Sequence, residues 1–134
     1  MANTLKTTSD VQDVKCKIFS LSLADFMANS NVIDVAIPAG AVVTAGFFNV
    51  TTAFSGSSAD TIAVGDSGSA TRYKSATSSA STGLTALVPT GYEVTGAETS
   101  ALRITRAVTG TATTGAVDVC VCYVIKGNSE SNFD

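Results

Sequence analysis

Residues 32–54 read VIDVAIPAGAVVTAGFFNVTTAF, and this stretch decides the fold. Two runs rich in Val, Ile, Phe and Thr flank the break Pro38-Ala39-Gly40. Branched and aromatic side chains favour strands, and Pro at the second position of a type I turn with Gly at the fourth is a favoured combination. The sequence therefore predicts two strands around a turn. Neither face of the second run is charged, so we expect that strand to lie centrally in a sandwich or against another subunit.

The remainder of the chain repeats this pattern of short apolar runs and polar breaks. Runs that recur about every 8 to 12 residues between Gly- and Ser-rich turns, with almost no helical periodicity, are typical of all-β proteins. We predict an antiparallel β-sandwich or jelly roll of about eight short strands. The further predicted strands are 14–23, 61–64, 70–77, 84–88, 92–95, 102–108 and 116–125, and the predicted turns or loops are 55–59, 75–83, 89–91, 96–99 and 109–115.

One helical turn interrupts the strand pattern after residue 22. Ser22 is placed to be its N-cap and Asp25 lies at the N3 position, which is a loose form of the capping box. The polar sequence Asn29-Ser30-Asn31 is expected to end the turn.

Length and hydropathy indicate one domain with polar ends. The 134 residues suffice for a single core, and we predict a flexible N-terminal arm at 1–13, a β-sandwich domain at 14–126 and a C-terminal tail at 127–134. No apolar run approaches the roughly 18 to 20 residues that cross a bilayer, so we expect no membrane partner. The start MANTLKTTSD lacks an apolar core, which predicts synthesis in a cytoplasm without a secretory signal or lipoprotein leader.

Charge argues against a nucleic-acid partner and for close protein contact. The formal net charge is −3, and the eight Lys and Arg residues are scattered, whereas phosphate binding needs clustered cations. The polar residues are mainly Thr and Ser, while Lys and Glu, which lose the most side-chain entropy at an interface, are few. This composition favours a structural protein that works by being bound, and homo-oligomerisation is expected.

Catalytic arrangements find little support in the residue types. The chain has no His, which removes the Ser-His-Asp and Cys-His arrangements that activate a nucleophile. Two carboxylates could serve a glycosidase, but most acidic residues lie beside Gly, Ser or Thr and are expected in solvated turns. We therefore predict that the protein is not an enzyme and has no catalytic residues. The acidic residues considered are Asp60, Asp66, Glu93, Glu98 and Asp118.

The cysteines predict reduced, buried thiols. Cys120 and Cys122 are two residues apart on one face of a strand, where neighbours are poorly placed for a disulfide, and Cys16 is distant in sequence. A metal site formed by the three cysteines is the alternative, which the absence of His makes weak.

Ligand-binding motifs are also weak, and we predict no cofactor, metal or cofactor-binding residues. Asp66-Ser67-Gly68-Ser69 offers alternating oxygens like a calcium loop, but no bidentate acidic ligand follows, so a plain turn is favoured. A sugar-binding module would need aromatic platforms, and the chain has no Trp and only Tyr73, Tyr92 and Tyr123. No Gly-rich phosphate cradle follows a strand and opens a helix.

The stretch 32–54, the TIAVGD sequence at 61–66 and the strand AVDVCVCYVI at 116–125 resemble small β-sandwich proteins of tailed-bacteriophage virions. In those proteins an IPAGAVV turn, an NVTTAF strand and a TIAVGD-like strand recur. The resemblance covers about residues 32–66 plus the last strand. It implies a capsid decoration, or cement, protein: a homotrimer on the outer surface of the head shell, with the major capsid protein as its partner and no catalytic residues.

The resemblance also suggests a mechanical role. A shell packed with DNA is under outward pressure, and a clamp that binds only the assembled state stabilises it by mass action. On this hypothesis the arm 1–13, with the tail 127–134, lies on the shell or on a sister subunit. The alternatives are a tail, head-to-tail or fibre component of low copy number, and a carbohydrate-binding or host-surface adhesion module.

Overall fold

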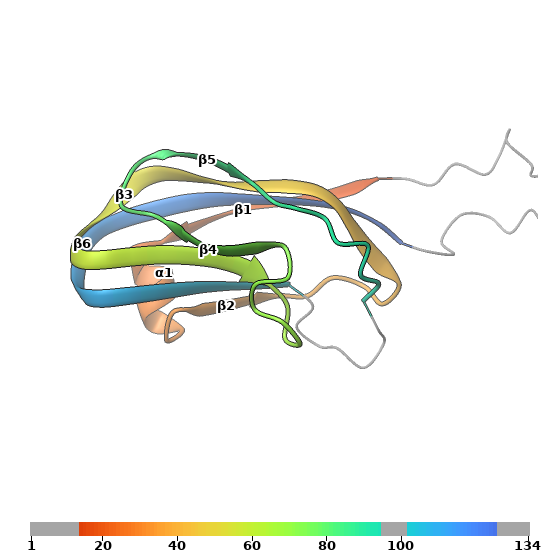
Figure 1. Ribbon diagram of the computed structural model, residues 1–134, viewed down its shortest axis with the longest axis horizontal. Helices are drawn as coiled ribbons and strands as arrows, with labels where there is room; N and C mark the ends of the chain where they lie inside the picture. Colours follow the sequence, from red (N-terminus) through yellow and green to blue (C-terminus); the bar gives the residue numbers. More distant parts are fainter. Residues whose placement is uncertain (1–13, 95–101, 126–134) are drawn as a thin grey trace, which may run out of the picture.

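The computed structural model describes residues 14–94 and 102–125, which form an antiparallel all-β body (Figure 1). The all-β class predicted from the sequence is confirmed. The predicted arm 1–13, the tail 127–134 and the turn 96–99 lie outside the described residues. Within the described part of the chain, no helix has the length and apolar character needed to span a membrane. The elements are β1 (Lys15–Ser22), α1 (Leu23–Ala28), β2 (Val32–Val35), β3 (Ala41–Gly65), β4 (Lys74–Ser78), β5 (Gly83–Ala86) and β6 (Leu102–Ile125).

Two long strands dominate this body. β3 has 25 residues and β6 has 24, and they pair antiparallel along nearly their whole length. The predicted turn at 55–59 and loop at 109–115 are therefore wrong, because both segments lie inside these strands. The pairing shifts register repeatedly between Val50 and Ala59, and Gly56 and Gly110 take positive φ values of 100° and 92°. The ladder bends at this point instead of ending, so the described residues form six strands where the sequence predicted about eight for the chain.

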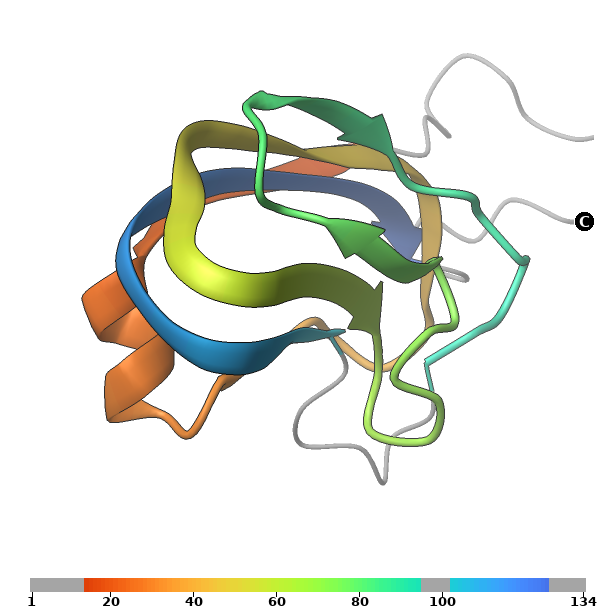
Figure 2. The same ribbon diagram turned by 60° about the vertical axis from the view of Figure 1, so that its left-hand side comes forward.

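The bend divides the sheet into two halves (Figures 1 and 2). In the first half, residues 41–50 and 117–125 of the long strands lie between β5 and β1. In the second half, residues 59–65 and 103–109 lie between β4 and β2. All six strands nevertheless belong to one hydrogen-bonded sheet, because β3 and β6 run through both halves.

The hydrophobic core lies between the two halves. Phe48 and Val119 from the first half and Ile62 and Ile104 from the second are each fully buried. α1 closes one side with Phe26, whose ring meets the ring of Phe54 edge-on at a centroid distance of 5.9 Å. The inward-facing apolar residues of both long strands thus form a single core.

The predicted helical turn and its boundaries are confirmed. The Ser22 hydroxyl accepts a hydrogen bond from the Asp25 N–H (3.3 Å), and the Asp25 carboxylate accepts one from the Ser22 N–H (2.8 Å), which completes the capping box. The helix ends where Ser30 and Asn31 adopt left-handed φ values of 55° and 65°. The Asn31 N–H there donates to the Phe26 carbonyl (2.7 Å).

The Pro38-Ala39-Gly40 turn forms, but one residue later than predicted. The Ala41 N–H donates to the Pro38 carbonyl (3.2 Å), so Pro38 is the first residue of the turn and Gly40, with φ of 83°, is the third. A positive φ at the third position suits glycine. The two flanking strands do not pair with each other: β2 pairs with β6 in the second half, and β3 begins in the first half. The turn therefore carries the chain between the halves.

The later connections also differ from the prediction. Residues 92–94 do not fold back on 84–88; they continue in the direction of β5 along the same edge of β3. The Leu87 N–H donates to Gly46, and further along the Val94 N–H donates to Ala41. The segment 89–91 is thus an interruption within one edge and does not reverse the chain. The predicted strand 70–77 is limited to β4, which occupies part of the predicted loop 75–83.

Candidate interaction surface

The outer side of the first half carries a row of apolar side chains across four strands. Directly opposed residues of antiparallel strands point to the same face. Ile18 lies opposite Cys120, and Phe47 lies opposite both Cys120 and Ala86. The neighbours of Cys120 along β6 are buried, so this row faces outward. The outer apolar face, as we define it, consists of Cys16, Ile18, Ser20, Val42, Ala45, Phe47, Asn49, Leu84, Ala86, Asp118, Cys120, Cys122 and Val124.

This face collects most of the exposed apolar side chains. The two most exposed large hydrophobic residues in the described part of the chain are Ile18 and Leu84, at 69% and 66%. Val14 and Val88, also exposed, follow the same alternation just beyond the ends of β1 and β5. Asp118 is the one charged residue within this set, and its carboxylate accepts a hydrogen bond from the Ser20 hydroxyl (2.6 Å). The exposed Glu93, opposite Val42, adds a second carboxylate at the edge of the face. The face therefore offers few side-chain groups that form hydrogen bonds with water.

The outer side of the second half is polar. The Arg103 guanidinium donates to both carboxylate oxygens of Asp34, at 2.7 and 3.1 Å, and both side chains are about one-third exposed. This hydrogen bonding raises the pKa of Arg103 above its ordinary value, so the guanidinium remains charged. The two outer sides of the bent sheet thus differ in chemistry, and the apolar one is the candidate interaction surface.

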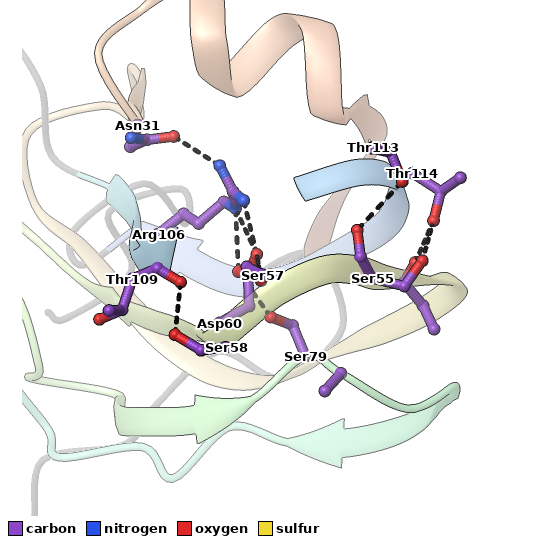
Figure 3. A network of polar contacts seen from close by, with 12 residues as sticks. Asn31, Ser55, Ser57, Ser58, Asp60, Ser79, Arg106, Thr109, Thr113 and Thr114 are labelled. Atoms are coloured by element: carbon purple, nitrogen blue, oxygen red, sulfur yellow. Dashed lines mark hydrogen bonds and ion pairs between the residues drawn. The ribbon is translucent and has the colours of Figure 1, made fainter. Parts of the chain in front are cut away.

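Three of the acidic residues considered for catalysis, Asp60, Asp66 and Asp118, are engaged in structural contacts, and the first of them is buried. Asp60 is 2% exposed and forms an ion pair with Arg106, which is 5% exposed (Figure 3). The guanidinium donates to both Asp60 oxygens, and the Ser79 hydroxyl donates a further hydrogen bond (3.0 Å). Asn31 accepts from the same guanidinium (2.9 Å). The expectation of a solvated turn is wrong for Asp60. Its carboxylate is enclosed by Arg106 on β6, by the link after α1 and by the link after β4.

Asp66 closes a turn, as predicted, but it is not solvated. One carboxylate oxygen accepts the N–H groups of Gly68 (2.9 Å) and Ser69 (2.7 Å), and the other pairs with Arg72. The hydrogen bond to Asp66 raises the pKa of Arg72, which therefore stays charged. Both oxygens are occupied by donors, so the loop has the character of a braced turn and not of a calcium site. Of the other acidic residues, Glu93 is exposed beside Val42, and Glu98 lies outside the described residues.

The tyrosines are not arranged as a row of exposed rings. Tyr73 and Tyr123 belong to the core, at 1% and 5% exposure. The ring of Tyr92 is covered by the Arg72 guanidinium, whose central carbon lies 3.6 Å from the ring centre. A flat aromatic platform for a sugar ring is thus not formed by these three residues.

The prediction of reduced thiols is wrong for two of the three cysteines. Cys16 and Cys122 form a disulfide between directly opposed residues of β1 and β6, whose Cα atoms are 4.1 Å apart. Cys120 is half-buried and free, and it does not bond to Cys122, as expected for neighbours on one face. Among the described residues, no group of three or more Cys, Asp or Glu side chains is placed to hold a metal ion. All three cysteines belong to the outer apolar face.

Comparison with known proteins points to a virus particle. The chain is similar to a chain of the solved structure "Cyanophage Pam1 capsid asymmetric unit", with 27% identity and a TM-score of 0.64. The match covers 93% of this chain and 92% of that chain, so it concerns the whole domain. No family model and no curated protein sequence matches. The similarity supports a structural protein of a phage virion that associates with the capsid, in agreement with the broader part of the resemblance drawn from the sequence.

Proposed function

We propose that this protein is a capsid decoration, or cement, protein: a homotrimer that binds the outside of an assembled phage head shell and stabilises it against internal pressure. The observation that carries the proposal is the similarity, over nearly the full length of both chains, to a component of a capsid asymmetric unit. Such a component is repeated by the symmetry of its capsid. A protein of this kind is present in many copies, as a decoration protein is.

The architecture supports a binding role and not an enzymatic one. Two halves of four strands enclose one core, which we interpret as the β-sandwich body predicted from the sequence. The carboxylates of Asp60 and Asp66 are held by cations and by hydrogen-bond donors. The outer apolar face, in contrast, offers a broad surface for protein contact.

Stabilisation of the shell follows from linkage. A protein that binds the assembled shell and not its separated subunits shifts the equilibrium toward assembly. Three linked copies raise the avidity without any single strong contact. We place the shell contact in the arm 1–13 together with the tail 127–134, while the described body holds the copies in place.

The first test is the copy number of this chain in purified particles of the phage that carries it. We expect an abundance comparable with that of the major capsid protein, measured by quantitative mass spectrometry of intact virions. A few copies per particle would indicate a tail, head-to-tail or fibre component instead. Complete absence would favour a carbohydrate-binding or host-surface adhesion module, which glycan-array binding would then identify.

Removal of residues 1–13 tests the arm. The assay adds the truncated protein to shells that carry no copies of the wild-type protein and measures attachment by co-sedimentation. We expect attachment to be lost, because the arm supplies the shell contact. The circular dichroism of the truncated protein should be unchanged, since the described body begins after residue 13. A matched truncation of residues 127–134 separates the contribution of the tail. Full attachment of the protein without its arm would contradict this assignment.

A further inference from the structure

We infer that the outer apolar face is the surface through which copies of this chain associate. The inference rests on the self-association included in the proposed function and assigns it to particular residues. The partner is a second copy of the chain, and its contact is centred on Ile18, Phe47 and Leu84.

The outer apolar face exposes large apolar side chains to water. Ile18 and Leu84 expose 69% and 66% of their surface, and the half-buried Phe47 lies between their strands. Burial of apolar surface contributes roughly 25 cal/mol per Å² of area removed from water. Exposed apolar patches on small proteins commonly mark contact surfaces. This face therefore gains free energy when another apolar surface covers it.

The distribution of charge on the chain favours contact through this face. The chain has a formal net charge of −3, so two copies repel each other if their charged surfaces meet. Two carboxylates belong to the face or its edge: Asp118, which already accepts a hydrogen bond from Ser20, and Glu93, opposite Val42. Contact through this face leaves the Asp34–Arg103 pair, on the outer side of the other half, in water. The centre of the face, around Ile18, Phe47 and Leu84, is uncharged and can thus pack against the same surface of a second copy.

The area of the outer apolar face is large enough for a specific interface. Four strands at a spacing of about 4.8 Å, each about eight residues long at about 3.3 Å per residue, cover roughly 500 Å². Contact between two such faces therefore involves about 1,000 Å² in total, which is the lower bound for a specific interface. The exposed Val14 and Val88 extend the contact beyond the strands.

A second copy and the shell differ in when they can cover this face. An apolar face left uncovered after folding promotes non-specific association of the free protein. A shell covers it only after assembly, whereas another copy is present as soon as the chain folds. Self-association is the cover available at every stage.

The experiment measures oligomeric state by size-exclusion chromatography with light scattering. The wild-type protein is expected to have a mass of at least about twice the 13.5 kDa of one chain, because two faces in direct contact give a dimer, whereas in a trimer each copy shares its face between two neighbours. Ile18→Lys and Leu84→Lys should each shift it to 13.5 kDa, because a lysine ammonium opposes burial in an apolar contact. Met27→Lys is the control: Met27 is 61% exposed, like the test residues, but lies on α1. Both test residues are exposed, so circular dichroism should show intact folds.

Cys120 supplies a second measurement that does not depend on the size of the complex. It is the free cysteine of the three and belongs to this face. Its alkylation should be at least about tenfold slower in the associated wild-type protein than in Leu84→Lys, whose substitution is not opposite Cys120, and Met27→Lys should react as slowly as the wild type.

The outcomes separate this inference from the proposed function. A wild-type oligomer that survives both face substitutions, with unchanged Cys120 reactivity, overturns the assigned surface but leaves self-association intact. A wild-type monomer at all concentrations overturns the self-association. If face variants become monomers and yet the protein is absent from virions, the assigned surface stands and the decoration role fails.

Discussion

Asp60→Ala is expected to lower the free energy of unfolding by about 3–5 kcal/mol, because it leaves the Arg106 guanidinium buried without its carboxylate. Asp60 also accepts the Ser79 hydroxyl, and the contacts of Arg106 extend to Asn31. These bonds join β3, β6, the link after α1 and the link after β4 (Figure 3). Loss of the carboxylate therefore affects all four segments. Urea denaturation of the purified protein measures the change.

Two controls sharpen this result. Asp34→Ala removes a carboxylate from the exposed pair with Arg103 and should cost only about 0–1 kcal/mol, since water screens such pairs. Replacing both buried partners together, as Asp60→Leu with Arg106→Met, should recover much of the loss, because no unpaired charge remains in the interior. Equal losses of unfolding free energy for Asp60→Ala and Asp34→Ala would show that the buried pair stabilises the fold no more than the exposed pair.

Removal of the disulfide is the second large effect. Cys16 and Cys122 are 106 residues apart in sequence, so the bond restricts the unfolded chain over most of its length. Loop-closure entropy for a span of this size predicts a stabilisation of up to about 4–5 kcal/mol, and native disulfides typically contribute 2–5 kcal/mol. We expect Cys16→Ser with Cys122→Ser to lower the melting temperature by on the order of 10 °C.

The measurement is thermal unfolding with and without a reductant. Reductant should lower the melting temperature of the wild-type protein and of Cys120→Ser, which keeps the disulfide. It should leave the double serine variant unchanged. A wild-type melting temperature that does not respond to reductant, with the bond confirmed as reduced by mass spectrometry, would contradict the expected stabilisation.

The sequence predicted those features that neighbouring residues determine. The capping box of Ser22 and Asp25, the end of the helix at 29–31 and the extended conformation of 116–125 depend on residues close in the chain, and the structure confirms them. Only the start of that strand differs, because 116–125 is the second part of β6. The all-β class follows in the same way from apolar periodicity. Local signals of this kind survive in the folded protein because pairing with distant strands reinforces them.

Features that depend on distant pairing could not be predicted. Segments 55–59 and 109–115 are rich in Gly, Ser and Thr, which by themselves favour turns, but they hydrogen-bond to each other and continue the long strands. The burial of Asp60 requires Arg106, and the disulfide requires the register that puts Cys16 opposite Cys122. No local pattern contains these pairings. The candidate surface did have a sequence signal, since the run 41–54 has no charge on either face.

The position of β6 in the chain sets the order in which this protein folds. β6 pairs with β1, β2 and β3, yet it follows every other described strand in sequence. Neither half of the sheet is complete until residues 102–125 have left the ribosome, so folding of this body during synthesis waits for its last described strand. Contacts this distant in sequence also slow folding, because the loop must close before they stabilise the fold. Nascent chains therefore expose the apolar residues of the earlier strands until β6 has emerged.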